Sequence, residues 1–155
     1  MECSHMKKTI IIGVTVLLAL SLSACAFQKT AITAEDFTRI ATSLGYSVDD
    51  ATEQMEGNTE TSLLAYDEAQ DFQIEFHVVS TRSQASTAYS ENKAKFDGIG
   101  AGSNLTMSGM NWASYAKTAG GKYSYVAYIE TTMVYVSAPE EYKQDIKDFI
   151  SELGY

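Results

Sequence analysis

The chain is poor in cysteine, histidine and basic residues, and each shortage excludes a class of protein. Its 155 residues include two cysteines and two histidines. Because Cys3 and Cys25 both precede the expected folded part, a disulfide framework is excluded. His77 is the one histidine beyond His5, so no Cys/His spacing suits zinc and a nucleophile has no evident base. We therefore expect no metal, no cofactor and no enzymatic activity.

Basic residues are missing from the middle of the chain as well. The formal net charge is −9, and nine acidic residues but no basic one lie between Arg39 and Arg82. Such a surface repels nucleic acid, so DNA and RNA are excluded as partners. The acidic segment 49–75 leaves two interpretations open. It is either a solvated acidic loop or a loose calcium site formed by Asp49, Asp50, Asp67 and Asp71.

What is present begins at the N-terminus. Lys7 and Lys8 precede an apolar stretch from Ile10 to Leu20, and small residues then lead to Cys25. This order predicts a secretory signal peptide over residues 1–24, in which 1–5 come from an upstream start or an added remnant. The stretch is shorter than the ~20 residues of a membrane span, so a stop-transfer helix is the weaker alternative. An ordinary secretory signal cleaved elsewhere is another.

The end of this segment carries a more specific motif. Leu22-Ser23-Ala24-Cys25 resembles the lipobox of bacterial lipoproteins. The resemblance implies cleavage before Cys25 and attachment of acyl chains such as palmitate to its thiol. Two chains anchor a protein stably, where one binds only marginally. We therefore expect the protein on the outer surface of the cytoplasmic membrane. Residues 25–32 form the lipidated cysteine and a short tether.

Hydrophobic periodicity predicts alternating groups of helices and strands in a single domain, residues 33–155. Short loops between strands require antiparallel pairing. The predicted class is α+β, with one antiparallel sheet of about five to six strands and helices packed mainly on one face. The predicted order is helix, two strands, helix, four strands, helix. The predicted elements are a helix over 33–44, strands over 62–66 and 72–78, a helix over 83–97, strands over 105–110, 111–118, 122–130 and 132–137, and a helix from Pro139. Gly120 and Gly121 predict a hairpin turn between the strands 111–118 and 122–130, because glycine adopts positive φ without steric cost.

Aromatic residues concentrate in the last four predicted strands. Trp112, Tyr115, Tyr123 and Tyr125 are the candidate contact residues, because exposed tyrosine and tryptophan give rigid platforms for a sugar or a protein. The alternative is that these side chains belong to the core, since tyrosine is a favoured strand residue.

Catalytic groups are sparse. Glu75 and His77 alternate with apolar residues on a predicted strand, and they are the pair that a hydrolase could use. An outward-facing histidine on a strand is more often a solvated surface residue. A catalytic role would require a concave pocket around the two side chains.

Three segments carry a wider resemblance. Residues 45–52, 135–147 and 153–155 resemble small uncharacterised lipoproteins of the Firmicutes type. The resemblance implies localisation and α+β architecture, and it transfers no activity or site residue. We expect a membrane-anchored lipoprotein that binds an envelope protein or a cell-envelope ligand such as a glycan. The alternatives are an envelope hydrolase, a hydrolase inhibitor or a passive assembly factor, and the oligomeric state stays open.

Overall fold

The computed structural model describes residues 28–155 except 56, 58 and 70. The expected signal peptide, the lipobox and Cys25 lie outside the described residues. Within the described part, none of the helices has the length and apolar character needed to cross a bilayer.

The described chain folds around one sheet of seven antiparallel strands, in the order β1-β2-β3-β7-β6-β5-β4. The α+β class with a single antiparallel sheet is confirmed. The strands are β1 (Ser47–Asp50), β2 (Thr59–Tyr66), β3 (Gln73–Val79), β4 (Gly102–Ser108), β5 (Trp112–Ala119), β6 (Lys122–Ile129) and β7 (Thr132–Pro139). The helices are α2 (Ala34–Ser43), α3 (Arg82–Asp97) and α4 (Lys143–Glu152), with 3-10 turns η2 (Thr52–Gln54) and η3 (Glu140–Tyr142).

The prediction of five to six strands is wrong, because it lacks the strand β1. The predicted order of elements is wrong for the same reason, since β1 lies between the first helix and β2. β1 pairs with the end of β2 at one edge of the sheet. Its sequence, Ser-Val-Asp-Asp, has one apolar residue, Val48, which packs on the core while Asp49 and Asp50 are exposed. A four-residue edge strand with two carboxylates carries too little alternation to be recognised from sequence.

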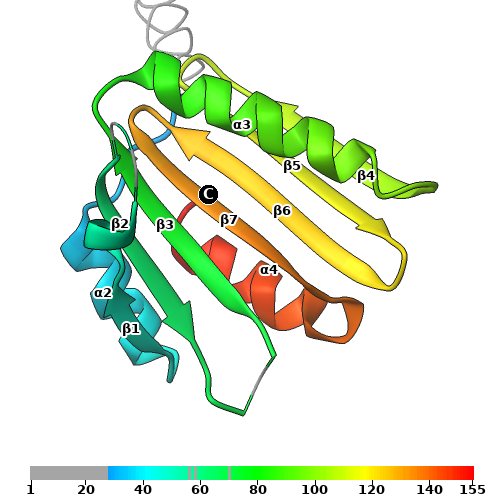
Figure 1. Ribbon diagram of the computed structural model, residues 1–155, viewed down its shortest axis with the longest axis horizontal. Helices are drawn as coiled ribbons and strands as arrows, with labels where there is room; N and C mark the ends of the chain where they lie inside the picture. Colours follow the sequence, from blue (N-terminus) through cyan, green and yellow to red (C-terminus); the bar gives the residue numbers. More distant parts are fainter. Residues whose placement is uncertain (1–27, 56, 58, 70) are drawn as a thin grey trace, which may run out of the picture.

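Helices cover both faces of the sheet, so the expectation that they pack mainly on one face is only partly right. Figure 1 shows α3 in front of β5 and β6, and α4 behind the sheet. Helices α2 and α4 share one core, in which the rings of Phe37 and Phe76 stack with centroids 4.9 Å apart. Helix α3 closes a second core on the opposite face, where Phe96 stacks on Tyr135 at 5.4 Å. Because β5, β6 and β7 carry apolar residues on both of their faces, helices pack on both faces of the sheet and bury these residues.

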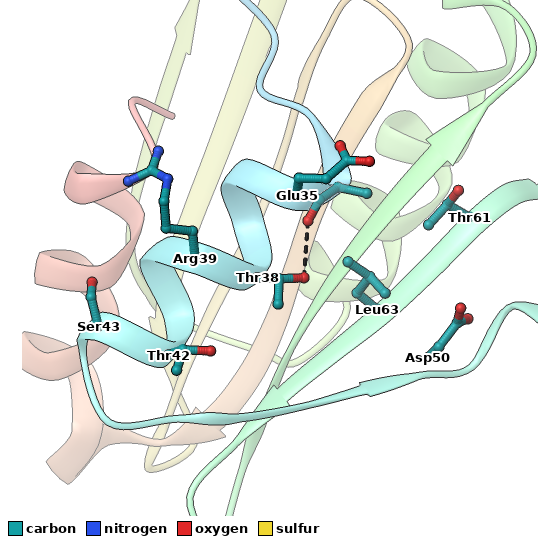
Figure 2. Close-up of a pocket in the computed structure, with 9 residues that line it drawn as sticks. Glu35, Thr38, Arg39, Thr42, Ser43, Asp50, Thr61 and Leu63 are labelled. Atoms are coloured by element: carbon teal, nitrogen blue, oxygen red, sulfur yellow. Dashed lines mark hydrogen bonds between the residues drawn. The ribbon is translucent and has the colours of Figure 1, made fainter.

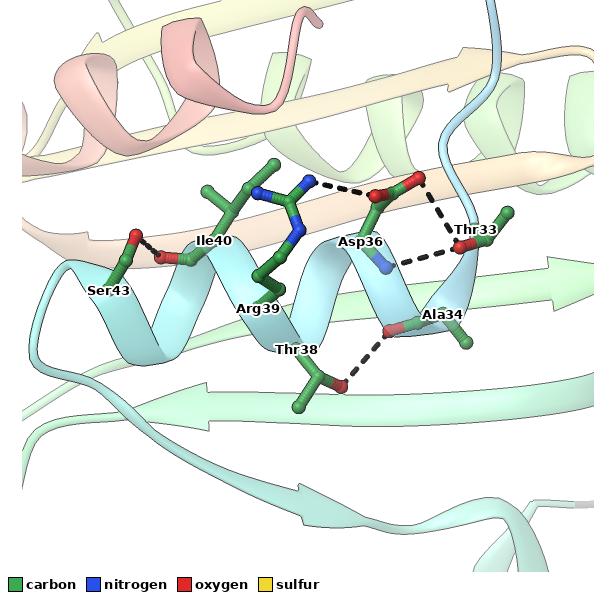
Figure 3. A network of polar contacts seen from close by, with 7 residues as sticks. All are labelled: Thr33, Ala34, Asp36, Thr38, Arg39, Ile40 and Ser43. Carbon is green, nitrogen blue, oxygen red and sulfur yellow. Dashed lines mark hydrogen bonds and ion pairs between the residues drawn. The ribbon is translucent and has the colours of Figure 1, made fainter.

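The start of α2 shows why the chain becomes helical there. The Thr33 hydroxyl accepts a hydrogen bond from the Asp36 backbone N–H, which satisfies one of the unpaired donors of the first turn (Figure 3). Arg39 lies 2.8 Å from the Asp36 carboxylate one turn later. This guanidinium and the Thr33 bond hold the pKa of Asp36 below its usual value. The pair is exposed, so its contribution to stability is small.

Helix α3 follows the prediction for 83–97 closely. Thr81 and Gln84 form a capping box, in which each side chain bonds to the other residue's backbone N–H. Ala85, Tyr89 and Phe96 face the sheet and are buried. The helix has weak amphipathic character, and these few buried residues suffice because the sheet below supplies Val126 and Tyr128.

Alternation along the strands sorts the C-terminal aromatics between the two faces. Tyr123 and Tyr125 of β6 face the core under α4, whereas Tyr115 of β5 faces α3. The predicted turn at Gly120 and Gly121 is confirmed, with both glycines at positive φ between the paired residues Ala119 and Lys122.

Candidate binding groove

The four aromatic residues expected to form an exposed contact surface are buried. The exposed fractions are 8% for Trp112, 1% for Tyr115, 5% for Tyr123 and 8% for Tyr125. They also do not share a face, because Tyr115 packs beneath α3 while Tyr123 and Tyr125 lie on the α4 side. The expectation of an exposed aromatic surface is therefore corrected. Tyr115, Tyr123 and Tyr125 belong to the two cores that the helices cover, and Trp112 is buried with the Lys29 ammonium over its ring.

Tyr123 and Tyr125 nevertheless form the floor of a concave feature. Helix α4 packs over the middle strands and leaves β4 uncovered, so a groove lies between β4 and α4. It consists of two neighbouring hollows of about 230 and 200 Å³. We name this feature the β4–α4 groove. Ala116, Tyr123 and Tyr125 form its floor, and burial raises the pKa of both tyrosine hydroxyls.

Lysines line the α4 side of the groove. Lys143 and Lys147 project from α4, and Lys29 lines the hollow that contains Tyr125. The Lys143 ammonium donates to the Thr118 hydroxyl at 3.1 Å and lies 5.6 Å from the centre of the Tyr123 ring. Among the residues that the structure describes, no acidic one lines either hollow. The groove is thus a basic site on an acidic protein.

The β4 side of the groove is apolar and exposed. Leu105 is 59% exposed and Met107 is 49% exposed, and both side chains line the groove. All seven residues of β4 are exposed, because this strand forms the end of the sheet and no described helix lies over it. Large apolar side chains on an uncovered strand beside a concave floor are characteristic of a contact surface.

The start of the described chain is fixed close to one end of this groove. The Lys29 backbone N–H donates to the Asn111 side-chain oxygen at 3.0 Å, and the Asn111 amide donates back to the Lys29 carbonyl at 2.7 Å. The Lys29 ammonium lies 4.5 Å from the centre of the Trp112 ring and donates to the Gly154 carbonyl. These contacts join the N-terminal segment to the β4–β5 turn and to the end of α4.

The pair Glu75 and His77 occupies a different hollow, of about 380 Å³, beside α3. The His77 Nε2 atom lies 3.2 Å from the Glu75 carboxylate, and the His77 side chain is 14% exposed. Burial alone would raise the pKa of Glu75, but hydrogen bonds from His77 and Gln73 leave it below its usual value. The His77 Nδ1 atom is buried without a partner among the described residues. The histidine is therefore half of a partly buried pair rather than a solvated surface residue.

Another hollow, of about 720 Å³, lies between α2 and the strands β1 and β2. Figure 2 shows Thr38 of α2 on one side and Leu63, Thr61 and Asp50 on the other. Its polar groups are engaged locally, since Thr38 donates to the Ala34 carbonyl and Asp50 accepts from the Thr52 backbone N–H. It is a wide and open surface.

The acidic segment does not assemble a metal site among the described residues. Within residues 28–155 except 56, 58 and 70, no three His, Cys, Asp or Glu side chains gather in a group that could hold a cation. Asp50 and Asp67 each accept a hydrogen bond from the backbone N–H two residues later. Local turn formation accounts for these two carboxylates.

Comparison with known proteins adds no further information. A scan of protein-family models matches none of them to this chain, and searches of curated proteins and of solved structures give no match either. The candidate site therefore rests on the geometry of the described residues.

Sequence reasoning identified Tyr123 and Tyr125 but missed the residues that make their surroundings a groove. Lys143 and Lys147 are four residues apart on one helix, so their side chains lie on the same face of it. This spacing does not indicate which strand the two lysines flank. Leu105 and Met107 fall in the predicted strand 105–110, and the pattern did not indicate whether that strand is covered. Their exposure follows from the sheet order, in which β4 is the last strand.

Proposed function

We propose that the protein is a membrane-anchored, extracytoplasmic lipoprotein that binds an envelope protein or ligand through the β4–α4 groove. The observation that supports this proposal is the juxtaposition of exposed Leu105 and Met107 with lysines that form no ion pair among the described residues, over a floor of tyrosines. Proteins seldom leave such apolar side chains on an open sheet edge without a partner. The proposed role is binding, without catalysis.

The position of Lys29 supports the anchored arrangement. Cys25 precedes Gln28 by three positions, a distance that a fully extended chain spans in about 10 Å. Gln28 itself contacts the Met110 sulfur at 4.0 Å. A lipid on Cys25 would hold the β4–β5 turn close to the bilayer surface. The rest of β4 would then lie farther from the membrane, with its edge open to a partner.

Anchoring is tested by labelling cells with a palmitate analogue. The wild-type chain should incorporate the label and sediment with membranes, and Cys25→Ala should do neither. Cys3→Ala is the matched control, because Cys3 lies in the segment that the proposal removes. Label in Cys25→Ala would contradict lipidation at Cys25. Absence of label from the wild type would contradict it as well.

Hydrolysis is the second candidate, and one observation favours it. The Glu75–His77 pair lies at hydrogen-bond distance in a hollow that Tyr135 and Lys95 also line, which is the concave setting that acid–base chemistry requires. A panel of ester, amide and glycoside substrates tests it. Turnover by the wild type that His77→Ala and Glu75→Gln each abolish would support a hydrolase, and absence of turnover would remove this candidate.

A further inference from the structure

We propose that the β4–α4 groove receives an extended, acidic segment of a partner polypeptide, which adds to β4 as an eighth strand of the sheet. This inference rests on the proposed function, because it names the chemistry of the partner that occupies the same site. It follows from three independent properties of the site: an open backbone edge, an apolar side and a row of lysines.

The backbone edge of β4 is available for pairing. The Gly109 N–H donates to the Trp112 carbonyl, which closes the β4–β5 hairpin. Because antiparallel strands alternate between bonded and non-bonded pairs, Ser103, Leu105 and Met107 direct their backbone groups to β5. Asn104, Thr106 and Ser108 then direct theirs away from the sheet, where no described strand lies. This edge offers about 24 Å of ladder.

The two edges of the sheet differ in protection. β1 has four residues and carries Asp49 and Asp50, and charges on a short strand discourage pairing with another chain. β4 has seven residues, with no charge and no proline, and its register against β5 is continuous from Gly102 to Ser108. An unprotected edge at one end and a protected edge at the other favour pairing at β4.

The side chains beside this edge determine what the added strand carries. Leu105 and Met107 point to the α4 side, so residues of an added strand on that side would cover them and lie over the groove. Lys143 and Lys147 flank the groove, and neither forms an ion pair with a carboxylate of the described residues. Among the alternate positions of the added strand that face α4, acidic side chains would meet these ammonium groups and apolar side chains would cover Leu105.

Charge also distinguishes this partner from a second copy of the same chain. Pairing of β4 with β4 of another copy would bring together two sets of the same lysines and two chains of net charge −9. Like charges at an interface disfavour association. An acidic segment from another polypeptide satisfies the lysines, and a second copy does not.

The test uses residues 28–155, which contain the whole sheet and both of its cores. The probe is a displayed library of short random peptides, followed by synthesis of the most enriched one. We expect enriched peptides to carry both Asp or Glu and apolar residues among every second position, which are the positions that face α4. On binding, hydrogen exchange at the outward amides of Asn104, Thr106 and Ser108 should slow by about tenfold or more, since each gains a ladder bond.

Two variants separate the parts of the proposal. Thr106→Pro removes an outward N–H without touching a bond to β5, and it should weaken binding of the enriched peptide by about tenfold or more. Lys143→Glu combined with Lys147→Glu should do the same and should favour basic peptides instead. Lys122→Glu, at an exposed position that starts β6 and lines neither hollow of the groove, is the matched control and should leave affinity within about twofold.

Several outcomes would overturn the inference. Failure to enrich any peptide, enrichment without acidic residues, or equal binding by Thr106→Pro would each do so. A dimer that Thr106→Pro dissociates would assign the edge to a second copy.

If crosslinks from β4 to a protein form in membranes while the enriched peptides are not acidic, the proposed function stands and this inference fails. If the peptides behave as expected but nothing crosslinks in membranes, the proposed function fails.

Discussion

The side chain of Asn111 holds the backbone of Lys29 from both sides, with the Lys29 N–H donating at 3.0 Å and the Lys29 carbonyl accepting at 2.7 Å. Residues separated by 82 positions are joined in this way, and the point where the chain enters the fold is fixed next to the β4–β5 turn. The link matters for the proposed anchoring, because it determines which end of the sheet would face the membrane.

Asn111→Ala should release the N-terminal segment. The variant loses two hydrogen bonds and leaves partly buried backbone groups unpaired, which costs about 1–3 kcal/mol of unfolding free energy. Urea denaturation measures this loss, and faster proteolysis within residues 28–33 reports the release. Asn104→Ala, on the exposed strand β4, is the control and should change the stability by less than about 0.5 kcal/mol. Equal effects of the two variants would contradict the assigned role of Asn111.

Tyr125→Ser should destabilise the protein strongly. Its ring packs in the core under α4 and is 8% exposed, so truncation leaves a cavity and costs about 3–5 kcal/mol. Tyr66→Ser, on the more exposed surface of β2, is the control and should cost less than about 1 kcal/mol. Thermal and urea unfolding measure both. An unchanged melting temperature for Tyr125→Ser would show that this ring is not a core residue.

Stability should fall at alkaline pH. Burial, together with the hydrogen bond that the Tyr115 hydroxyl donates to Asp97, raises the pKa of Tyr115 to about 12. Above pH ~10 the unfolded chain loses this proton while the folded chain keeps it, so the stabilisation present below pH ~10 is lost as the pH rises towards 12. Urea unfolding between these pH values measures the slope. The slope of the unfolding free energy against pH reports the number of protons that unfolding releases, and Tyr115→Phe should lower this number by about one. An unaltered slope would contradict the assignment.

Gly102→Ala should disturb the beginning of β4. An added Cβ would lie 2.1 Å from the Thr118 carbonyl oxygen and 2.7 Å from the Ala119 Cβ, so the strand must shift away from β5. We expect a loss of about 1–3 kcal/mol and faster hydrogen exchange at Ser103. Gly98→Ala meets its nearest atom at 3.3 Å and has a φ of −71°, so this matched variant should be nearly neutral. Exchange at Ser103 that stays slow in Gly102→Ala would refute the close approach.

Sequence patterns predicted the parts of the fold in which each residue carries a local signal. The helical spacing of Ala85, Tyr89 and Phe96 predicted α3, and Gly120 with Gly121 predicted the turn from β5 to β6, because hydrophobic periodicity and positive φ depend on nearby residues. β1 was missed because Asp49 and Asp50 conceal its alternation. The exposure of Leu105 could not be read from sequence, since it depends on which strand ends the sheet.

The candidate site shows the same limit. Tyr123 and Tyr125 were identified from composition, but whether they lie on a surface or in the core depends on where α4 packs, a contact between residues far apart in the chain. The lysines that flank them carried no signal of their own. A long-range packing contact, rather than any motif, produces the groove.

The most direct test of the central claim is photo-crosslinking from β4 in native membranes. A photoreactive phenylalanine analogue replaces Asn104 in the lipidated protein, and in a matched protein it replaces Glu91, which is exposed on α3. We predict that one protein partner is crosslinked from position 104 and not from position 91, and that Lys143→Glu with Lys147→Glu abolishes the product. Equal products from both positions, or none from position 104, would contradict the claim that the β4–α4 groove is the binding surface.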